Sequence, residues 1–97
     1  MPRFWGADEA DAALPRLAEL VQRVRDGAVT PQVAAEALAA DGILLRDPVR
    51  GLVDFTAVAA SGRPYWLCWV FGEPTVAFWH WPEDGFAGRR SLDQPPD

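Results

Sequence analysis

The chain has 97 residues, of which 49% are hydrophobic and 24% are charged, a composition typical of one globular domain. Its net charge of -5 at pH 7 argues against nucleic-acid binding, which requires a basic surface to neutralise phosphates. No apolar run approaches the ~18 residues of a membrane span, and the first residues do not resemble a signal peptide, so we expect a cytoplasmic protein without a membrane partner.

Two amphipathic helices are predicted in residues 1–41. Apolar residues recur at three- and four-residue steps over residues 9–24, as expected for one buried helix face. Pro15 lies inside this pattern and predicts a kink or a separate first turn, because it lacks a backbone N–H. Thr30 followed by proline is typical of a helix start, and the second helix is expected to run to about Ala40. The two elements predict a short helical hairpin.

A four-stranded antiparallel sheet is predicted in residues 42–90. Short runs rich in aromatic and β-branched residues alternate with turn sequences that contain Gly, Pro and Asp. The fold class is therefore α+β, with the helical hairpin packed on a β-meander in one domain, and residues 91–97 are expected to form a frayed tail. The predicted strands are residues 43–46, 52–55, 65–71 and 75–81.

The last two predicted strands are apolar on both faces. An antiparallel sheet with one solvated face alternates apolar and polar residues, so this pattern indicates that both faces are covered. Two short helices cover only one face, and we therefore expect a second copy of the chain to cover the other in a homodimer. The tryptophans expected at that interface are Trp66, Trp69, Trp79 and Trp81.

The second half of the chain contains the motifs GLVDF at residues 51–55, LCW at 67–69, GEP at 72–74, WH at 79–80 and GFAGR at 85–89. In this order and spacing they resemble a bacterial family catalogued as domain of unknown function 2203. The chain has nine arginines and no lysine or asparagine. Arginine has largely GC-rich codons, whereas lysine and asparagine have AT-rich codons, so this composition indicates a GC-rich genome and agrees with a bacterial source. Two departures are Gly6, where the family usually has a threonine cap, and shorter helices before the sheet. The resemblance supports the fold and implies no activity.

Three residues of these motifs are candidates for catalysis. A three-residue loop between the last two strands would place Trp66 opposite His80, so that Cys68 lies on the same face at ~7 Å or less. Asp54 joins them if the second strand pairs beside the third. The three side chains could then act as nucleophile, base and orienting group. The alternative, which we favour, is a structural polar network with a buried cysteine and a hydrogen-bonded core histidine.

No metal or other cofactor is predicted. His80 and Cys68 are the only histidine and the only cysteine, so a metal site would need carboxylates as further ligands. Glu73 is the nearest acid in sequence, but it lies too far along the strand from His80 to share a metal ion.

The loop with Gly85, Gly88 and Arg89 is a weak candidate for binding a phosphate or carboxylate through backbone amides and a guanidinium group. The alternative is a structural loop in which Arg89 pairs with an acid such as Asp54 or Glu73.

These observations predict a binding or assembly module, with a homodimer as the expected state. The rival hypothesis is a small enzyme or anionic-ligand binder that uses Asp54, Cys68, His80 and Arg89. The sequence does not decide whether the protein is an enzyme.

Overall fold

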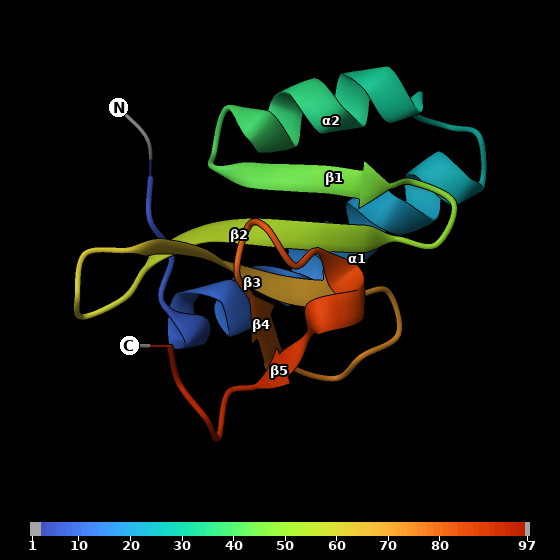
Figure 1. Ribbon diagram of the computed structural model, residues 1–97. Coiled ribbons are helices and arrows are strands. Elements are labelled where there is room, and N and C mark those ends of the chain that lie inside the picture. Colours follow the sequence, from blue (N-terminus) through green and yellow to red (C-terminus); the bar gives the residue numbers. More distant parts are fainter. Residues whose placement is uncertain (1–2, 97) are drawn as a thin grey trace.

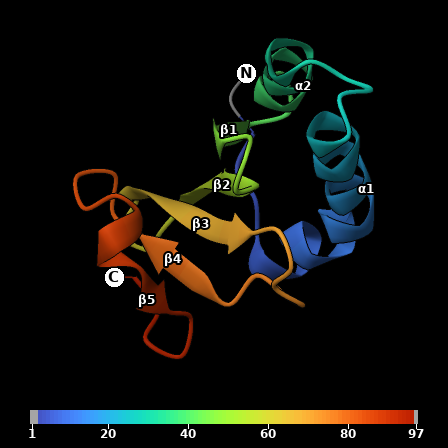
Figure 2. The ribbon, with the colours of Figure 1, turned by 90° about the vertical axis from the view of Figure 1, so that its right-hand side faces the viewer.

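The computed structural model describes residues 3–96 and has an α+β fold (Figure 1). Its strands form one antiparallel sheet in chain order, with the helices on one face. Figure 2 shows the sheet between α1 on one side and the C-terminal segment on the other. The elements are α1 (Ala7–Arg25), α2 (Pro31–Ala39), β1 (Ile43–Asp47), β2 (Leu52–Val58), β3 (Pro64–Val70), β4 (Phe78–His80), the 3₁₀ turn η1 (Phe86–Gly88) and β5 (Arg90–Ser91).

Helix α1 forms as its apolar pattern predicts, and it is longer by two residues at its start and one at its end. It is one helix that includes the exposed Pro15, so no separate first turn precedes the proline. Gly6 has no side chain to cap the helix as a threonine would. Instead, the amide of Gly6 donates to Oε1 of Glu9 at 3.1 Å, which stabilises the start of the helix. Among the described residues, neither helix is long and apolar enough to cross a membrane.

The predicted start of α2 is confirmed. Oγ1 of Thr30 accepts a hydrogen bond from the amide of Val33 at 3.2 Å, and Pro31 occupies the first helical position.

Replacing Thr30 with alanine should lower the free energy of unfolding by ~1 kcal/mol, because the amide of Val33 loses its acceptor. Urea denaturation of the two proteins measures this difference. Thr30→Ser keeps the acceptor oxygen and should remain close to the wild type. Equal stability of the alanine and serine variants would contradict the capping role.

The sheet has five strands instead of the predicted four. The fifth, β5, pairs with β4, and the amide of Leu92 donates to the carbonyl of Ala77 at 3.0 Å. The indole Nε1 of Trp79 also donates to the carbonyl of Gln94 at 2.9 Å. The segment predicted to be a frayed tail is thus held against the sheet through residue 94. A two-residue strand has no periodicity to detect, which is why the sequence pattern missed it.

The predicted register of the central strands is confirmed. Trp66 pairs with His80 across β3 and β4, and Asp54 pairs with Cys68 across β2 and β3. Strand β4 is shorter than predicted, because only residues 78–80 follow the ladder. The register places the even-numbered residues of β2, β3 and β4 on the face away from the helices.

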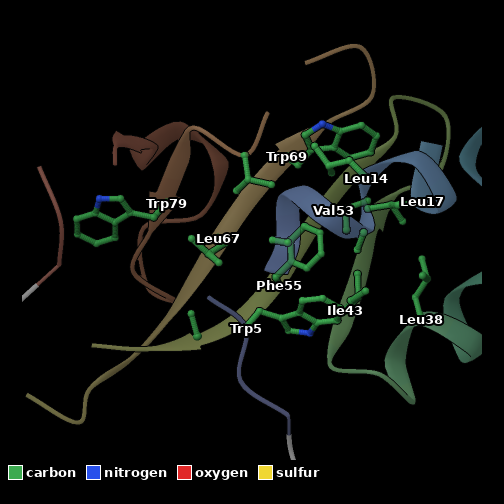
Figure 3. Close-up of a cluster of buried hydrophobic side chains, with 14 of the residues drawn as sticks. Trp5, Leu14, Leu17, Leu38, Ile43, Val53, Phe55, Leu67, Trp69 and Trp79 are labelled. Atoms are coloured by element: carbon green, nitrogen blue, oxygen red, sulfur yellow. The ribbon is translucent and has the colours of Figure 1, made fainter. Parts of the chain in front are cut away.

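The hydrophobic core lies between the helices and the odd-numbered residues of the strands (Figure 3). Trp5 packs edge-on against Phe55, with 5.2 Å between the ring centroids. Trp69 and Trp79 are also buried here, so these two predicted interface residues fill the core of a single chain.

The face away from the helices is covered in part by residues 81–89 of the same chain (Figure 2). The remaining tryptophans are partly exposed and carry arginine side chains on their rings. Arg46 lies over Trp66 and Arg63 over Trp81, at 5.0 and 3.7 Å from the ring centroids. The chain therefore covers much of the apolar surface from which a homodimer was predicted, and the homodimer itself stays a prediction.

Candidate functional site

Asp54, Cys68 and His80 meet on the sheet face away from the helices. They come from the neighbouring strands β2, β3 and β4, and all three are buried. One ligand-type atom from each, a carboxylate oxygen, Sγ and a ring nitrogen, lies within 4.8 Å of the other two. The fourth predicted residue, Arg89, reaches this cluster from the C-terminal segment, where its Nη2 donates to the carbonyl of Cys68 at 3.3 Å.

The orientation of the His80 ring is fixed from both sides. Nδ1 lies 2.8 Å from the carbonyl oxygen of Trp81, which only accepts, so Nδ1 carries a proton and donates it. Nε2 lies 3.1 Å from both carboxylate oxygens of Asp54. Two acceptor groups at this distance repel each other unless a proton or another cation lies between them. A hydrogen bond between Nε2 and the carboxylate satisfies both buried groups.

Arg46 completes the cluster, and sequence reasoning missed it. Its Nε donates to Oδ2 of Asp54 at 3.0 Å, which stabilises the buried carboxylate. The sequence contains one signal for this contact. Arg46 ends the first predicted strand and lies on the same face as Leu44, which pairs with Asp54. The β1–β2 register is irregular between Leu45 and Asp47. For this reason the pairing of residues outward from the turn does not predict the contact between Arg46 and Asp54.

Cys68 is not arranged as a catalytic nucleophile. Burial, followed by the negative charge of Asp54, raises the pKa of its thiol to about 12, while Arg89 opposes the shift. The side chain is therefore a neutral thiol at neutral pH. Both nitrogens of His80 already face other groups, Asp54 and the Trp81 carbonyl, so neither is directed at the thiol as a base.

The structure places Arg89 in an ion pair and over two aromatic rings. Its Nη2 donates to Oε1 of Glu73 at 2.7 Å, and the guanidinium group stacks on Phe78 and Phe86 at 4.1 and 4.8 Å from the ring centroids. Oε1 of Glu73 also accepts the amide of Val70 at 2.7 Å. These contacts tie the C-terminal segment to the sheet, as in the structural alternative in which Arg89 pairs with an acid.

The two glycines of the predicted anion loop have conformational and packing roles. Gly85 has φ of 64°, which favours glycine. A Cβ on Gly88 would lie 2.5 Å from Cβ of Asp84, so the close approach of these two residues requires a glycine. Gly85 also lines the pocket described next, whereas Gly88 does not.

A pocket of about 290 Å³ lies above the Asp54–His80 pair. Strand residues form its floor, and the segment after β4 forms part of its wall. The side chain of Arg46 is 43% exposed at this surface, whereas that of Asp54 is 3% exposed. The lining residues are Arg46, Leu52, Asp54, His80, Pro82, Gly85 and Phe86.

Comparison with known proteins identifies a family. No curated protein and no solved structure matches the chain. The model of a family described as "Uncharacterized conserved protein (DUF2203)" matches residues 29–92, which is more than half of the chain. This range contains the motifs of residues 51–89 that carry the resemblance and all the residues of the cluster. The chain belongs to the DUF2203 family.

Proposed function

We propose that the protein is a small-molecule binding module whose pocket above Asp54 and His80 takes a small oxyanion, a carboxylate or a phosphate. The observation that carries this proposal is the position of Arg46 at the pocket wall. Its Nε is engaged by Asp54, while among residues 3–96 its two terminal guanidinium nitrogens have no hydrogen-bond partner. A guanidinium group with two free nitrogens can bind an oxyanion in a bidentate manner.

The charges around the pocket favour an anion. Among the described residues, Asp54 is the only carboxylate in the lining, and it is buried and hydrogen-bonded to His80 and Arg46. Arg46 is therefore the exposed charge of the lining, with a side chain 43% exposed against 3% for Asp54, in a protein whose overall charge is -5. An anion gains from this local field despite the negative charge of the whole protein.

The remaining lining restricts the size of the ligand. Leu52, Pro82 and Phe86 supply apolar contact area beside the charged floor. A pocket of about 290 Å³ lies near the lower end of ligand sites, which typically measure ~300–1,000 Å³. A short organic acid or a small phosphate ester fits this combination of one guanidinium group and a small apolar wall.

This proposal keeps the anionic ligand of the sequence analysis and replaces Arg89 with Arg46 as the ligand-binding arginine. It does not require chemistry at Cys68, whose thiol is neutral and has no base directed at it. Phosphate and acetate are the simplest probes of the shared oxyanion chemistry.

An NMR titration of the metal-free protein with inorganic phosphate or acetate, in the presence of a chelator, tests the proposal. We expect saturable shifts of the indole signal of Trp66, which lies under Arg46, and of the ring signals of His80. Arg46→Ala should weaken binding by at least about tenfold, since it removes a charged hydrogen-bonding partner. Arg23→Ala, on the exposed side of α1, is the matched control and should bind as the wild type does. Equal binding by the two alanine variants, or no saturable shift, would refute the proposal.

A further inference from the structure

We propose that Asp54, Cys68 and His80 bind a zinc ion at the floor of the pocket. Thiolate, imidazole and carboxylate are the three side-chain ligands that zinc uses in proteins. Adjacent ligand atoms around a tetrahedral zinc ion lie ~3.3 Å apart when the bonds are ~2.0–2.1 Å. The separation of 3.1 Å between His80 Nε2 and Asp54 Oδ1 is close to this value, and Sγ of Cys68 lies within 4.8 Å of both groups.

The groups around the three side chains orient them as metal ligands. A zinc-binding histidine usually donates its other N–H to a carbonyl or carboxylate, and Nδ1 of His80 does so to Trp81. When the proton between Nε2 and Asp54 leaves, the lone pair of Nε2 is available to a metal ion beside the carboxylate. Arg46 holds Oδ2 of Asp54 and leaves Oδ1 for the metal, in the manner of the hydrogen bonds that support ligating carboxylates.

Zinc binding requires two protons to leave. One is the thiol proton of Cys68, and the other is the proton shared by Nε2 of His80 and the carboxylate of Asp54. The ion then forms bonds to the thiolate, the neutral imidazole and the carboxylate, whose two negative charges balance its charge. Metal binding to deprotonated ligands characteristically releases protons in this way.

The fourth coordination position would face the pocket. Asp54 and His80 line the pocket, whereas Cys68 is fully buried on β3. A zinc ion with three protein ligands keeps a water molecule or a ligand in its fourth position. The site goes beyond oxyanion binding and does not depend on it, because the three protein ligands are complete without an anion.

Cobalt substitution tests the site in the untagged 97-residue protein, without added phosphate or carboxylate. We expect one bound Co²⁺ with a thiolate-to-cobalt charge-transfer band, and loss of that band when zinc displaces cobalt. Zinc titrations in buffers with different ionisation enthalpies should give a release of about two protons per ion. Zinc should also raise the thermal unfolding midpoint of the wild type.

Two ligand variants and one control make the test specific. Cys68→Ala should abolish the charge-transfer band and lower zinc affinity by about 10- to 100-fold or more, and His80→Gln should lower zinc affinity similarly. Glu19→Gln, which changes an exposed carboxylate on α1, should leave both unchanged. The site is refuted if the wild type shows no charge-transfer band and no zinc-dependent stabilisation. It is also refuted if folded Cys68→Ala, checked by near-ultraviolet circular dichroism, binds zinc as tightly as the wild type. Oxyanion binding is measured in chelator, so either proposal can fail while the other holds.

Discussion

Replacing Asp54 with alanine should lower the free energy of unfolding of the metal-free protein by ~3 kcal/mol. The carboxylate is buried and accepts from Nε2 of His80 and Nε of Arg46. Its removal leaves a buried ring N–H without an acceptor, which is among the more costly changes that a core tolerates. Urea denaturation with a chelator present measures the loss.

Two comparisons separate this network from an ordinary surface pair. Glu19→Ala removes an exposed ion pair with Arg23 and should change stability by ~0.5 kcal/mol or less. A double-mutant cycle of Asp54→Ala and His80→Ala should give a coupling of ~1 kcal/mol or more, because each single change already breaks the contact. If Asp54→Ala costs no more than Glu19→Ala, the buried network is absent.

Gly51→Ala should cost ~3 kcal/mol, the sum of backbone strain and a steric clash. Gly51 has φ of 71°, and a Cβ there would lie 2.4 Å from Cβ of Phe71 and 3.0 Å from Cγ1 of Val21. Its amide donates to the carbonyl of Asp47 at 2.8 Å, so it closes the turn that aligns β1 with β2. This alignment places Arg46 against Asp54.

Gly27→Ala is the matched control for this prediction. Gly27 has φ of 78°, but a Cβ there would meet no atom within 4 Å. It should therefore show the strain alone, ~1–2 kcal/mol. Thermal or urea unfolding of the two variants gives the difference. Equal losses at the two glycines would contradict the close packing of the β1–β2 turn against Phe71.

The sequence predicted the register of the central strands correctly because two features agreed. The assumption of a three-residue loop after Phe71 and a period of two along the strands both place Trp66 opposite His80, and this pairing holds although β4 begins only at Phe78. Once that pair is set, Cys68 must share a face with His80, and the adjacent strand brings Asp54 beside them. The strand register therefore predicts which residues form the cluster, but it does not predict their hydrogen bonds.

The chemistry of the cluster was less predictable, because it depends on contacts that strand periodicity does not encode. The Nδ1 contact of His80 uses a backbone carbonyl, which any residue supplies. Arg46 reaches Asp54 past a register irregularity, and Arg89 prefers Glu73 on the loop before β4. Arg46 and Arg89 thus have different positions, one at the pocket wall and one in an internal ion pair.

The homodimer prediction considers only the two helices as cover for the sheet. The aromatic residues on both faces are identified correctly, but residues 82–89 have no apolar periodicity and are not counted as cover for the sheet. In the structure, Arg89 stacks on Phe78 from the side away from the helices. Arginines also lie over the partly exposed rings of Trp66 and Trp81. A lone arginine stacked on an aromatic ring has no periodic signature in a sequence.

The most direct measurement is a long-range ¹H–¹⁵N correlation spectrum of the His80 ring, the only histidine in the chain. In the metal-free protein we expect Nδ1 to give the signal of a protonated nitrogen, because the Trp81 carbonyl accepts its proton. Asp54→Ala should shift the Nε2 signal and leave Nδ1 protonated. A ring that averages between tautomers as in free histidine, with signals insensitive to Asp54→Ala, would contradict the buried Asp54–His80 pair on which both proposed sites depend.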